Sequence, residues 1–333
     1  MIQQANSVKE TTYITYANMM NNNDTITKTL QKEFTSLSAQ FRTISQTHLQ
    51  DLHTELLSWK DHGLITKEFY EQNYGSLLFN PSDTLPQVHS IIIIGIPQKI
   101  ILLEFIHKEK QYHTVLPPTY QYTKLRARCN DILSKVFTKY GYHIDRAQLP
   151  VKLLAVRSGL GQYGKNNLCY VEGMGSFTRL EAFYTDYEFP IDNWSEKKLM
   201  KACNNCHLCR DACPTQAIPN NRILINADHC LTYLNENKGE FPNWIPEHAH
   251  NAIVGCMFCQ TICPQNKKFL TPEKNMIHFT EKETIALLNQ TQREQISQSL
   301  VEKLTELDLD EYYPLLKRNI LTLIQTKSFN PTS

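Results

Sequence analysis

The chain has 333 residues, of which 41% are hydrophobic and 20% charged, and its formal net charge at pH 7 is +1. This size allows a substantial buried core and predicts two structural units. The balanced charge excludes a globally basic protein that binds nucleic acid through its net charge. It leaves room for a local basic patch, with solvated surface as the other interpretation, at Lys124, Arg126, Arg128, Lys267 and Lys268.

The first residues of the chain are polar and contain no apolar segment typical of a signal peptide. The most apolar stretch, 91–105, is interrupted at Pro97 and is too short to span a bilayer. We therefore expect a cytoplasmic protein without membrane contact, in a compartment that keeps thiols reduced. Residues 1–22 are polar and rich in asparagine, and we predict that they are disordered.

Helices and strands alternate through the first half of the chain. A helical region is predicted from Asp24, and its clearest part runs from Leu49 to Trp59 with one apolar face. A short helix is predicted from Thr66. The β-branched run 91–96 predicts a central strand that is buried on both faces, and residues 99–105 are expected to return as its neighbour.

A long amphipathic helix is predicted after Pro118, with an apolar stripe from Leu125 to Tyr140. A strand end at 142–145 and a helix at 149–158 follow, and then two strands at 168–171 and 177–184. This alternation favours an α/β or α+β sandwich. Beyond residue 271 the chain is predicted to be helical, starting with a capping box formed by Thr280 and Glu283.

A glycine-rich segment lies between the helix at 149–158 and the next strand, with the sequence Gly159-Leu160-Gly161-Gln162-Tyr163-Gly164-Lys165-Asn166-Asn167. It matches neither the dinucleotide-binding fingerprint nor a phosphate-binding P-loop. Its glycines allow the backbone to approach a ligand closely. A tight structural turn is the other interpretation.

Eight of the ten cysteines lie between residues 203 and 263. They form a C-x2-C-x2-C-x3-C-P motif, one separate cysteine and a C-x2-C-x3-C-P motif, which together are typical of a two-cluster bacterial ferredoxin. In such proteins the last cysteine of each motif binds the other cluster. We therefore predict one [4Fe–4S] cluster on Cys203, Cys206, Cys209 and Cys263, and a second on Cys213, Cys230, Cys256 and Cys259.

Two alternatives remain open for these cysteines. Pairs of C-x2-C also bind structural zinc, although zinc requires neither the triplet nor the paired C-P endings. The clusters could also be purely structural, or only relay electrons. The two remaining cysteines, Cys129 and Cys169, are predicted to be structural, with Cys129 on the apolar face of its helix.

Together these motifs resemble those of the epoxyqueuosine reductases, cytosolic enzymes that depend on cobalamin and iron–sulfur clusters and are related in their core to reductive dehalogenases. The resemblance runs from about Ser90 to Asn266 and rests on the strand at 89–94, the glycine-rich segment, residues 175–180 and the cysteine pattern. Lys317-Arg318-Asn319 is similar to the family's C-terminal helix. The chain departs from the family at Val151, Gln162 and the Glu181-Ala182 pair, and at Pro117-Pro118.

The resemblance implies an α+β fold, with a nitroreductase-like, cobalamin-binding α/β sandwich at 23–195. A ferredoxin-like domain with two [4Fe–4S] clusters would occupy 196–270, and a short helical tail 271–333. Asp145 falls at the position of the family's proton donor; a solvent-facing carboxylate beside Arg146 is the other interpretation. The expected cofactor contacts are Gly159, Leu160, Gly161, Gly164, Lys165, Asn166 and Ser176.

Three functional hypotheses follow. The first is a reductase with two [4Fe–4S] clusters and cobalamin that reduces an epoxide, namely epoxyqueuosine in tRNA. The second is a divergent enzyme that uses the same cofactors on a small molecule. The third is an electron-transfer protein that binds no corrinoid. The expected partners are a low-potential donor of the ferredoxin or flavodoxin type and, for the first hypothesis, tRNA; no DNA is expected.

Overall fold

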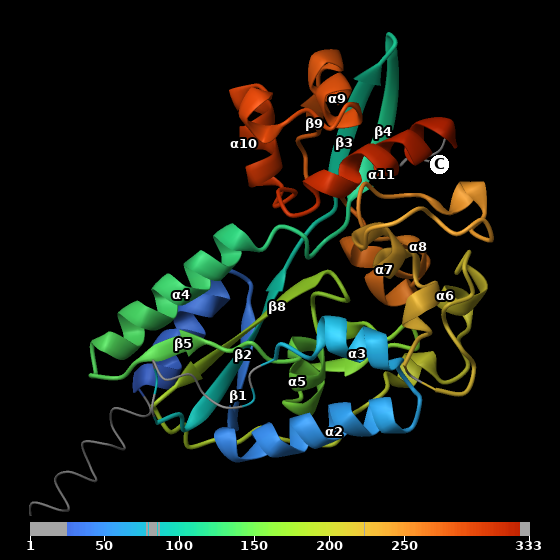
Figure 1. Cartoon of the computed structure of the whole chain (residues 1–333). Helices are drawn as coiled ribbons and strands as arrows, with labels where there is room; N and C mark the ends of the chain where they lie inside the picture. Colours follow the sequence, from blue (N-terminus) through green and yellow to red (C-terminus); the bar gives the residue numbers. More distant parts are fainter. Residues whose placement is uncertain (1–24, 78, 80–84, 86, 223, 327–333) are drawn as a thin grey trace, which may run out of the picture.

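The structure is a computed structural model of the chain, and it describes residues 25–77, 79, 85, 87–222 and 224–326 (Figure 1). The predicted disordered segment, 1–22, lies outside the described residues. The fold mixes helices and strands, as expected. None of the helices in the described part of the chain is long and apolar enough to cross a membrane.

The first sheet has four antiparallel strands in the order β1-β2-β8-β5. Its central strand β2 has no exposed residue, which confirms the prediction of a buried strand at 91–96. The short strand β1, between the first helix and α2, was not predicted. The four strands are β1 (Gln40–Ser45), β2 (Ser90–Pro97), β8 (Thr178–Thr185) and β5 (Ile144–Arg146).

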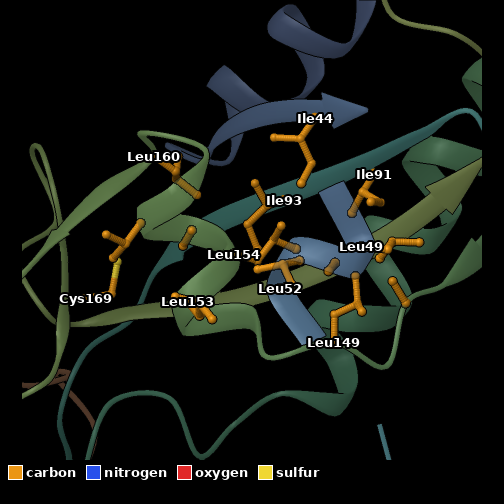
Figure 2. Packing of buried hydrophobic residues seen from close by; sticks show 14 of the residues in the cluster. Ile44, Leu49, Leu52, Ile91, Ile93, Leu149, Leu153, Leu154, Leu160 and Cys169 are labelled. Atoms are coloured by element: carbon orange, nitrogen blue, oxygen red, sulfur yellow. The ribbon is translucent and has the colours of Figure 1, made fainter. Parts of the chain in front are cut away.

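Helices cover both faces of this sheet because successive residues of β2 point to opposite sides. Ile91 and Ile93 pack with residues of α2 and α5 in one hydrophobic core, which Figure 2 shows at close range. Ile92 and Ile94 pack with α4 and the helix at 25–36 on the other face. These helices are α2 (Leu49–Asp61), α3 (Lys67–Asn73), α4 (Thr123–Thr138) and α5 (Val151–Arg157).

The second sheet has the order β4-β3-β9, and it corrects one expectation. The segment after Pro97 does not return beside β2, whose neighbours are β1 and β8. It forms a hairpin with the following residues and pairs with β9 in parallel, with Leu103 opposite Ile277. The strands are β3 (Ile101–His107), β4 (Lys110–Leu116) and β9 (Ile277–Phe279).

The segment 271–326 is therefore not purely helical, because β9 precedes its helices. A buried carboxylate joins it to the hairpin: Glu104 of β3 hydrogen-bonds His278 of β9 at 2.9 Å and His113 of β4 at 3.0 Å. The helices pack on the hairpin in a core of their own, and the Thr280–Glu283 capping box is confirmed. They are α9 (Glu281–Leu288), α10 (Gln298–Glu306) and α11 (Tyr313–Gln325).

The cysteine-rich segment contains only short helices, and its two halves repeat one another. In each half a four-residue helix, α6 (Leu208–Asp211) or α8 (Phe258–Thr261), includes the last cysteine of a C-x2-C pair. Figure 1 shows both helices on the same side of the first sheet, with α7 (Leu231–Glu236) close to α8. The 3-10 turns here are Lys201–Cys203, Ala227–His229, Glu247–Ala249 and Pro264–Phe269.

Candidate metal centre and cofactor site

The structure brings the cysteines together in the two predicted sets. In the first set, burial and then the neighbouring charges of Cys203, Cys263 and Cys206 together raise the pKa of Cys209 to about 11. These four residues come from 203–209 and from the far end of the segment. The chain thus folds so that the second C-P motif lies beside the first triplet.

The second set surrounds a cavity of about 190 Å³. Its lining includes Cys213, Cys230, Cys256 and Cys259, together with apolar residues such as Ile218. Burial, with a smaller contribution from the charges of Cys230 and Cys213, raises the pKa of Cys256 to about 12. Thiolates in such a site need a compensating cation, because burial alone favours the neutral thiol.

Hydrogen-bond donors face several of these sulfur atoms. The backbone N–H of Ala217 donates to Cys213 Sγ at 3.4 Å, and the side-chain amide of Asn251 donates to Cys256 Sγ at 3.3 Å. Such donors are typical of iron–sulfur proteins, where they stabilise thiolate ligands. The four-thiol sets, the cavity and the donors fit two clusters.

Among the described residues, no three His, Cys, Asp or Glu side chains converge closely enough to bind a single metal ion. All ten cysteines are free thiols. Cys129 and Cys169 are buried in the hydrophobic cores on opposite faces of the first sheet, as predicted for structural cysteines.

The glycine-rich segment forms a hairpin of β6 (Gly161–Tyr163) and β7 (Cys169–Val171). A side chain at Gly161 would come within 2.4 Å of Cys169 Sγ, and one at Gly164 within 2.6 Å of the Tyr170 ring. Both glycines are therefore required by close packing inside the hairpin itself.

The tip of this hairpin contacts the cysteine segment. The Lys165 ammonium donates to the carbonyl oxygens of Asn204 and Cys206, at 3.0 and 3.1 Å. The buried Asn166 amide donates to the Tyr170 hydroxyl at 2.9 Å and to the Cys259 carbonyl at 3.3 Å. These two predicted cofactor contacts thus hold the loops of both cysteine sets.

Ser176, another predicted cofactor contact, also hydrogen-bonds the cysteine segment, near its second C-P motif. Its N–H donates to Asn266 Oδ1 at 2.9 Å, and its hydroxyl contacts Gln260 Oε1 at 3.1 Å. Asn266 is completely buried and donates to Ser176 Oγ at 2.8 Å. The second C-P motif is therefore fixed to the turn that precedes β8.

The remaining predicted contacts, Gly159, Leu160 and Gly161, line a cleft of about 660 Å³. Its opposite wall comes from the end of the cysteine segment and includes Pro264, Lys268 and Phe269. Its lining also includes charged residues, such as Arg42 and Glu172, so the cleft is mixed in character.

Asp145 lies in β5 at the edge of the first sheet, opposite Tyr184. It is half-buried, and its Oδ1 accepts a hydrogen bond from the N–H of Arg146 at 2.7 Å. Its charge adds to burial in raising the pKa of Tyr184. Among the described residues, Asp145 lines neither the cleft nor the cavity above.

The structure also reveals site residues that were not predicted. Lys152 and Asn167 line the cavity of the second cysteine set, and Lys152 Nζ donates to Asn167 Oδ1 at 2.7 Å. Tyr170 contacts Cys263, and burial raises the pKa of its hydroxyl, with that contact as a further cause. Asn167 ends the glycine-rich segment, and the only sequence signal for Lys152 and Tyr170 was proximity to that segment.

The C-terminal helix α11 hydrogen-bonds the backbone of segments next to the second cysteine set. The Arg318 guanidinium donates to the carbonyl oxygens of Leu234 and Asn235, at 3.1 Å each, and to Asn237 at 2.9 Å. The buried Asn319 donates to Ile253 O at 2.9 Å. Two residues of Lys317-Arg318-Asn319, singled out in the sequence, therefore position the segments that carry the second cysteine set: Arg318 and Asn319.

One residue of the candidate basic patch, Arg126, is paired with a carboxylate. Arg126 forms an ion pair with the buried Glu181 at 3.0 Å, and Arg179 pairs with the same carboxylate at 2.8 Å. Lys268 lines the cleft described above. These contacts favour solvated or paired charges over a continuous basic surface.

Comparison with known proteins gives a first finding for the cysteine segment. Residues 202–266 match a family model described as a 4Fe-4S double cluster binding domain. This match confirms the predicted kind of metal domain and disfavours the zinc alternative.

Comparison with individual proteins gives a second finding. The chain is 27% identical to the epoxyqueuosine reductase of Staphylococcus aureus over 224 residues, 62% of this chain and 56% of that protein. It thus spans about half the length of that relative.

Two solved structures share the fold. The epoxyqueuosine reductase of Streptococcus thermophilus superposes with a TM-score of 0.64 at 19% identity, covering 90% of this chain and 80% of that one. An epoxyqueuosine reductase crystallised with an epoxyqueuosine-modified tRNA stem loop superposes with a TM-score of 0.63 at 20% identity, covering 91% and 82%. The resemblance seen in the sequence is confirmed.

Proposed function

We propose that this chain, a relative of the epoxyqueuosine reductases, is a cytoplasmic reductase that uses two [4Fe–4S] clusters and a bound corrinoid. The observation that carries the proposal is the joint placement of the two cysteine sets against the glycine-rich hairpin, through Lys165 and Asn166. A purely structural cluster domain does not need such a junction with a second, larger unit.

The proposed architecture has a nitroreductase-like sandwich, built on the first sheet, and a ferredoxin-like cluster domain. Residues 23–195 and 196–270 are the proposed limits of these units. The hairpin of β3 and β4 falls within the first of these limits but packs with the C-terminal helices instead of the first sheet.

Each part supplies a different step of a reduction. Clusters transfer single electrons, while a bound corrinoid supplies the bond-making chemistry that they lack. The residues proposed to face the corrinoid are those of the cleft between Gly159–Gly161 and Pro264–Phe269. Glycine backbone there allows close approach of a large planar group.

Asp145 is the proposed proton donor for the oxygen that leaves an epoxide. A general acid must be protonated at the working pH and within reach of that oxygen. Its half-buried position opposite Tyr184, at the edge of the first sheet, is the observation that supports this assignment. Reaching the substrate requires that the bound molecule extend to the β5 edge of the sheet.

The proposed substrate is epoxyqueuosine in tRNA, which the relatives' names and the tRNA stem-loop complex of a related enzyme support. A ferredoxin- or flavodoxin-type protein is the proposed electron donor. The second candidate function, reduction of a different small electrophile by the same cofactors, is favoured by the departures at Val151 and Gln162.

The test is anaerobic purification with corrinoid supplied, followed by assay on epoxyqueuosine-containing tRNA. We expect about eight irons per chain, bound cobalt and conversion of the modified base. About eight irons without cobalt would leave only the electron-transfer hypothesis. Cobalt-replete protein that does not convert this tRNA would exclude the tRNA substrate and favour the small-molecule reductase.

A further inference from the structure

Two hydrogen-bond donors in the cavity of the second cysteine set have unused capacity. The Lys152 ammonium, which can donate three hydrogen bonds, makes one with Asn167 Oδ1 among the described residues. Asn167 Nδ2 is buried and has no hydrogen-bond partner within the described part of the chain. Buried donors without acceptors are costly, so such groups indicate an acceptor that belongs there.

The backbone holds both donors firmly. Lys152 is the second residue of α5, whose following residues are buried in the core below the sheet. Asn167 sits in the left-handed region, with φ of 59°, and its N–H donates to Gly164 O at 2.9 Å. Lys152 is therefore held by α5, and Asn167 by the turn between β6 and β7.

The cavity wall that these donors share includes all four residues of the second cysteine set. Cys213, Cys230, Cys256 and Cys259 all line it. Burial lowers the pKa of Lys152 to about 8, and the charges of Cys169 and Cys230 oppose this shift. A [4Fe–4S] cluster with four thiolates is anionic, and its negative charge increases when it accepts an electron. A nearby cation and N–H donors stabilise that reduced state.

We propose that the Lys152 ammonium and the Asn167 amide donate to sulfur atoms of the second cluster and raise its reduction potential. Lys152 and Asn167 are thus positioning residues for electron transfer. This inference rests on the iron–sulfur part of the proposed function and is independent of the corrinoid and of tRNA.

The test is a redox titration of the anaerobically reconstituted full chain, followed by electron paramagnetic resonance of both clusters. The signal altered in Cys256→Ser identifies the second cluster. Lys152→Met, which keeps the length of the side chain without its charge, should make reduction of the second cluster at least tenfold less favourable, ~59 mV for one electron. The first cluster should not change.

Three further variants sharpen the test. Lys152→Arg keeps the charge and should restore most of the potential. Asn167→Gly, which tolerates the left-handed backbone, should shift the second cluster in the same direction by a smaller amount. Lys198→Met, an exposed lysine near β6, is the matched control and should shift neither cluster.

An unchanged potential of the second cluster in iron-replete Lys152→Met would overturn the inference, as would an equal shift of both clusters. If Lys152→Met assembles only one cluster, Asn167→Gly decides, and an unshifted second cluster in that variant would overturn the inference. A protein without any [4Fe–4S] signal would instead contradict the proposed function itself.

Discussion

Gly175 and Asn266 lie so close together that a side chain on the glycine would come within 2.4 Å of the asparagine Oδ1. The same oxygen accepts the N–H of Ser176, so it cannot move away without breaking that bond. Through this contact the end of the second C-P motif is fixed to the first sheet. The junction between the two proposed units therefore requires a residue without a side chain at position 175.

The first prediction is that Gly175→Ala loosens this junction. Gly175 has φ of 61°, which costs about 1–2 kcal/mol for alanine, and the clash with Asn266 adds to this cost. Gly173→Ala is the control, because Gly173 has φ of 76° but nothing within 4 Å of the new atom. The unfolding temperature and the iron content should fall much further in Gly175→Ala than in Gly173→Ala. Equal losses in the two variants would show that backbone strain alone causes the effect.

The second prediction concerns Cys230, which has no motif around it. Cys230→Ala should lower the iron content from about eight to about four per chain and leave the signal of the first cluster intact. Cys129→Ala, in the core away from both sets, should retain all the iron. Loss of both clusters, or of neither, would contradict the proposed ligand sets.

The third prediction tests the proposed acid. Asp145→Asn should keep iron and corrinoid content but lower turnover at least a hundredfold, the range typical of a general acid. Asp186→Asn is the control and should keep the wild-type turnover. Asp186 hydrogen-bonds His143 at 2.8 Å near the same sheet edge. If Asp145→Asn turns over at the wild-type rate, another group supplies the proton.

The fourth prediction is a pH dependence of stability from Glu236, which contacts the Tyr120 hydroxyl. Burial raises the pKa of Glu236 to about 7 from its ordinary value of 4.5. Between these values the folded chain keeps a proton that the unfolded chain has released. The free energy of unfolding therefore falls as pH rises through this window, by roughly 3 kcal/mol in all.

Glu236→Gln cannot titrate, so its unfolding temperature relative to the wild type should increase as pH rises from 5.5 to 8. Glu240→Gln, at an exposed glutamate of the next loop, should track the wild type at every pH. A difference between Glu236→Gln and wild type that does not change with pH would contradict the predicted linkage.

The fifth prediction concerns the hold of α11 on the cluster segment. Arg318→Met removes the donors to four carbonyl oxygens after Cys230 and should destabilise the chain by about 2–4 kcal/mol. The second cluster should then be lost to a chelator faster than the first. Lys317→Met should behave like wild type; a uniform loss of both clusters in Arg318→Met would argue against a local hold.

The sequence predicted best those parts of the fold that carry strong local signals. The isoleucine run gave β2, the apolar stripe from Leu125 gave α4, and the Thr280–Glu283 capping box gave the start of α9. The cysteine motifs predicted the kind of metal domain that the family comparison confirms.

Other features depend on long-range contacts and leave no local pattern. β9 has three residues and is a strand only because β3 lies beside it. The glycine-rich segment was predicted to contact a cofactor, but Lys165 and Asn166 contact the cysteine loops, which neither glycine nor lysine spacing specifies. Lys152 looks like any lysine in the first turn of a helix until the fold places it in the cavity of the second cysteine set.

The pairing of Leu103 with Ile277 has a consequence for how the chain is made. During synthesis, the hairpin of β3 and β4 leaves the ribosome long before its third strand exists. Until then one edge of β3 is open, and its apolar face lacks the helices that cover it. Nascent chains that stop short of residue 279 should therefore be prone to aggregation and depend on chaperones, even though every cluster cysteine has already been translated.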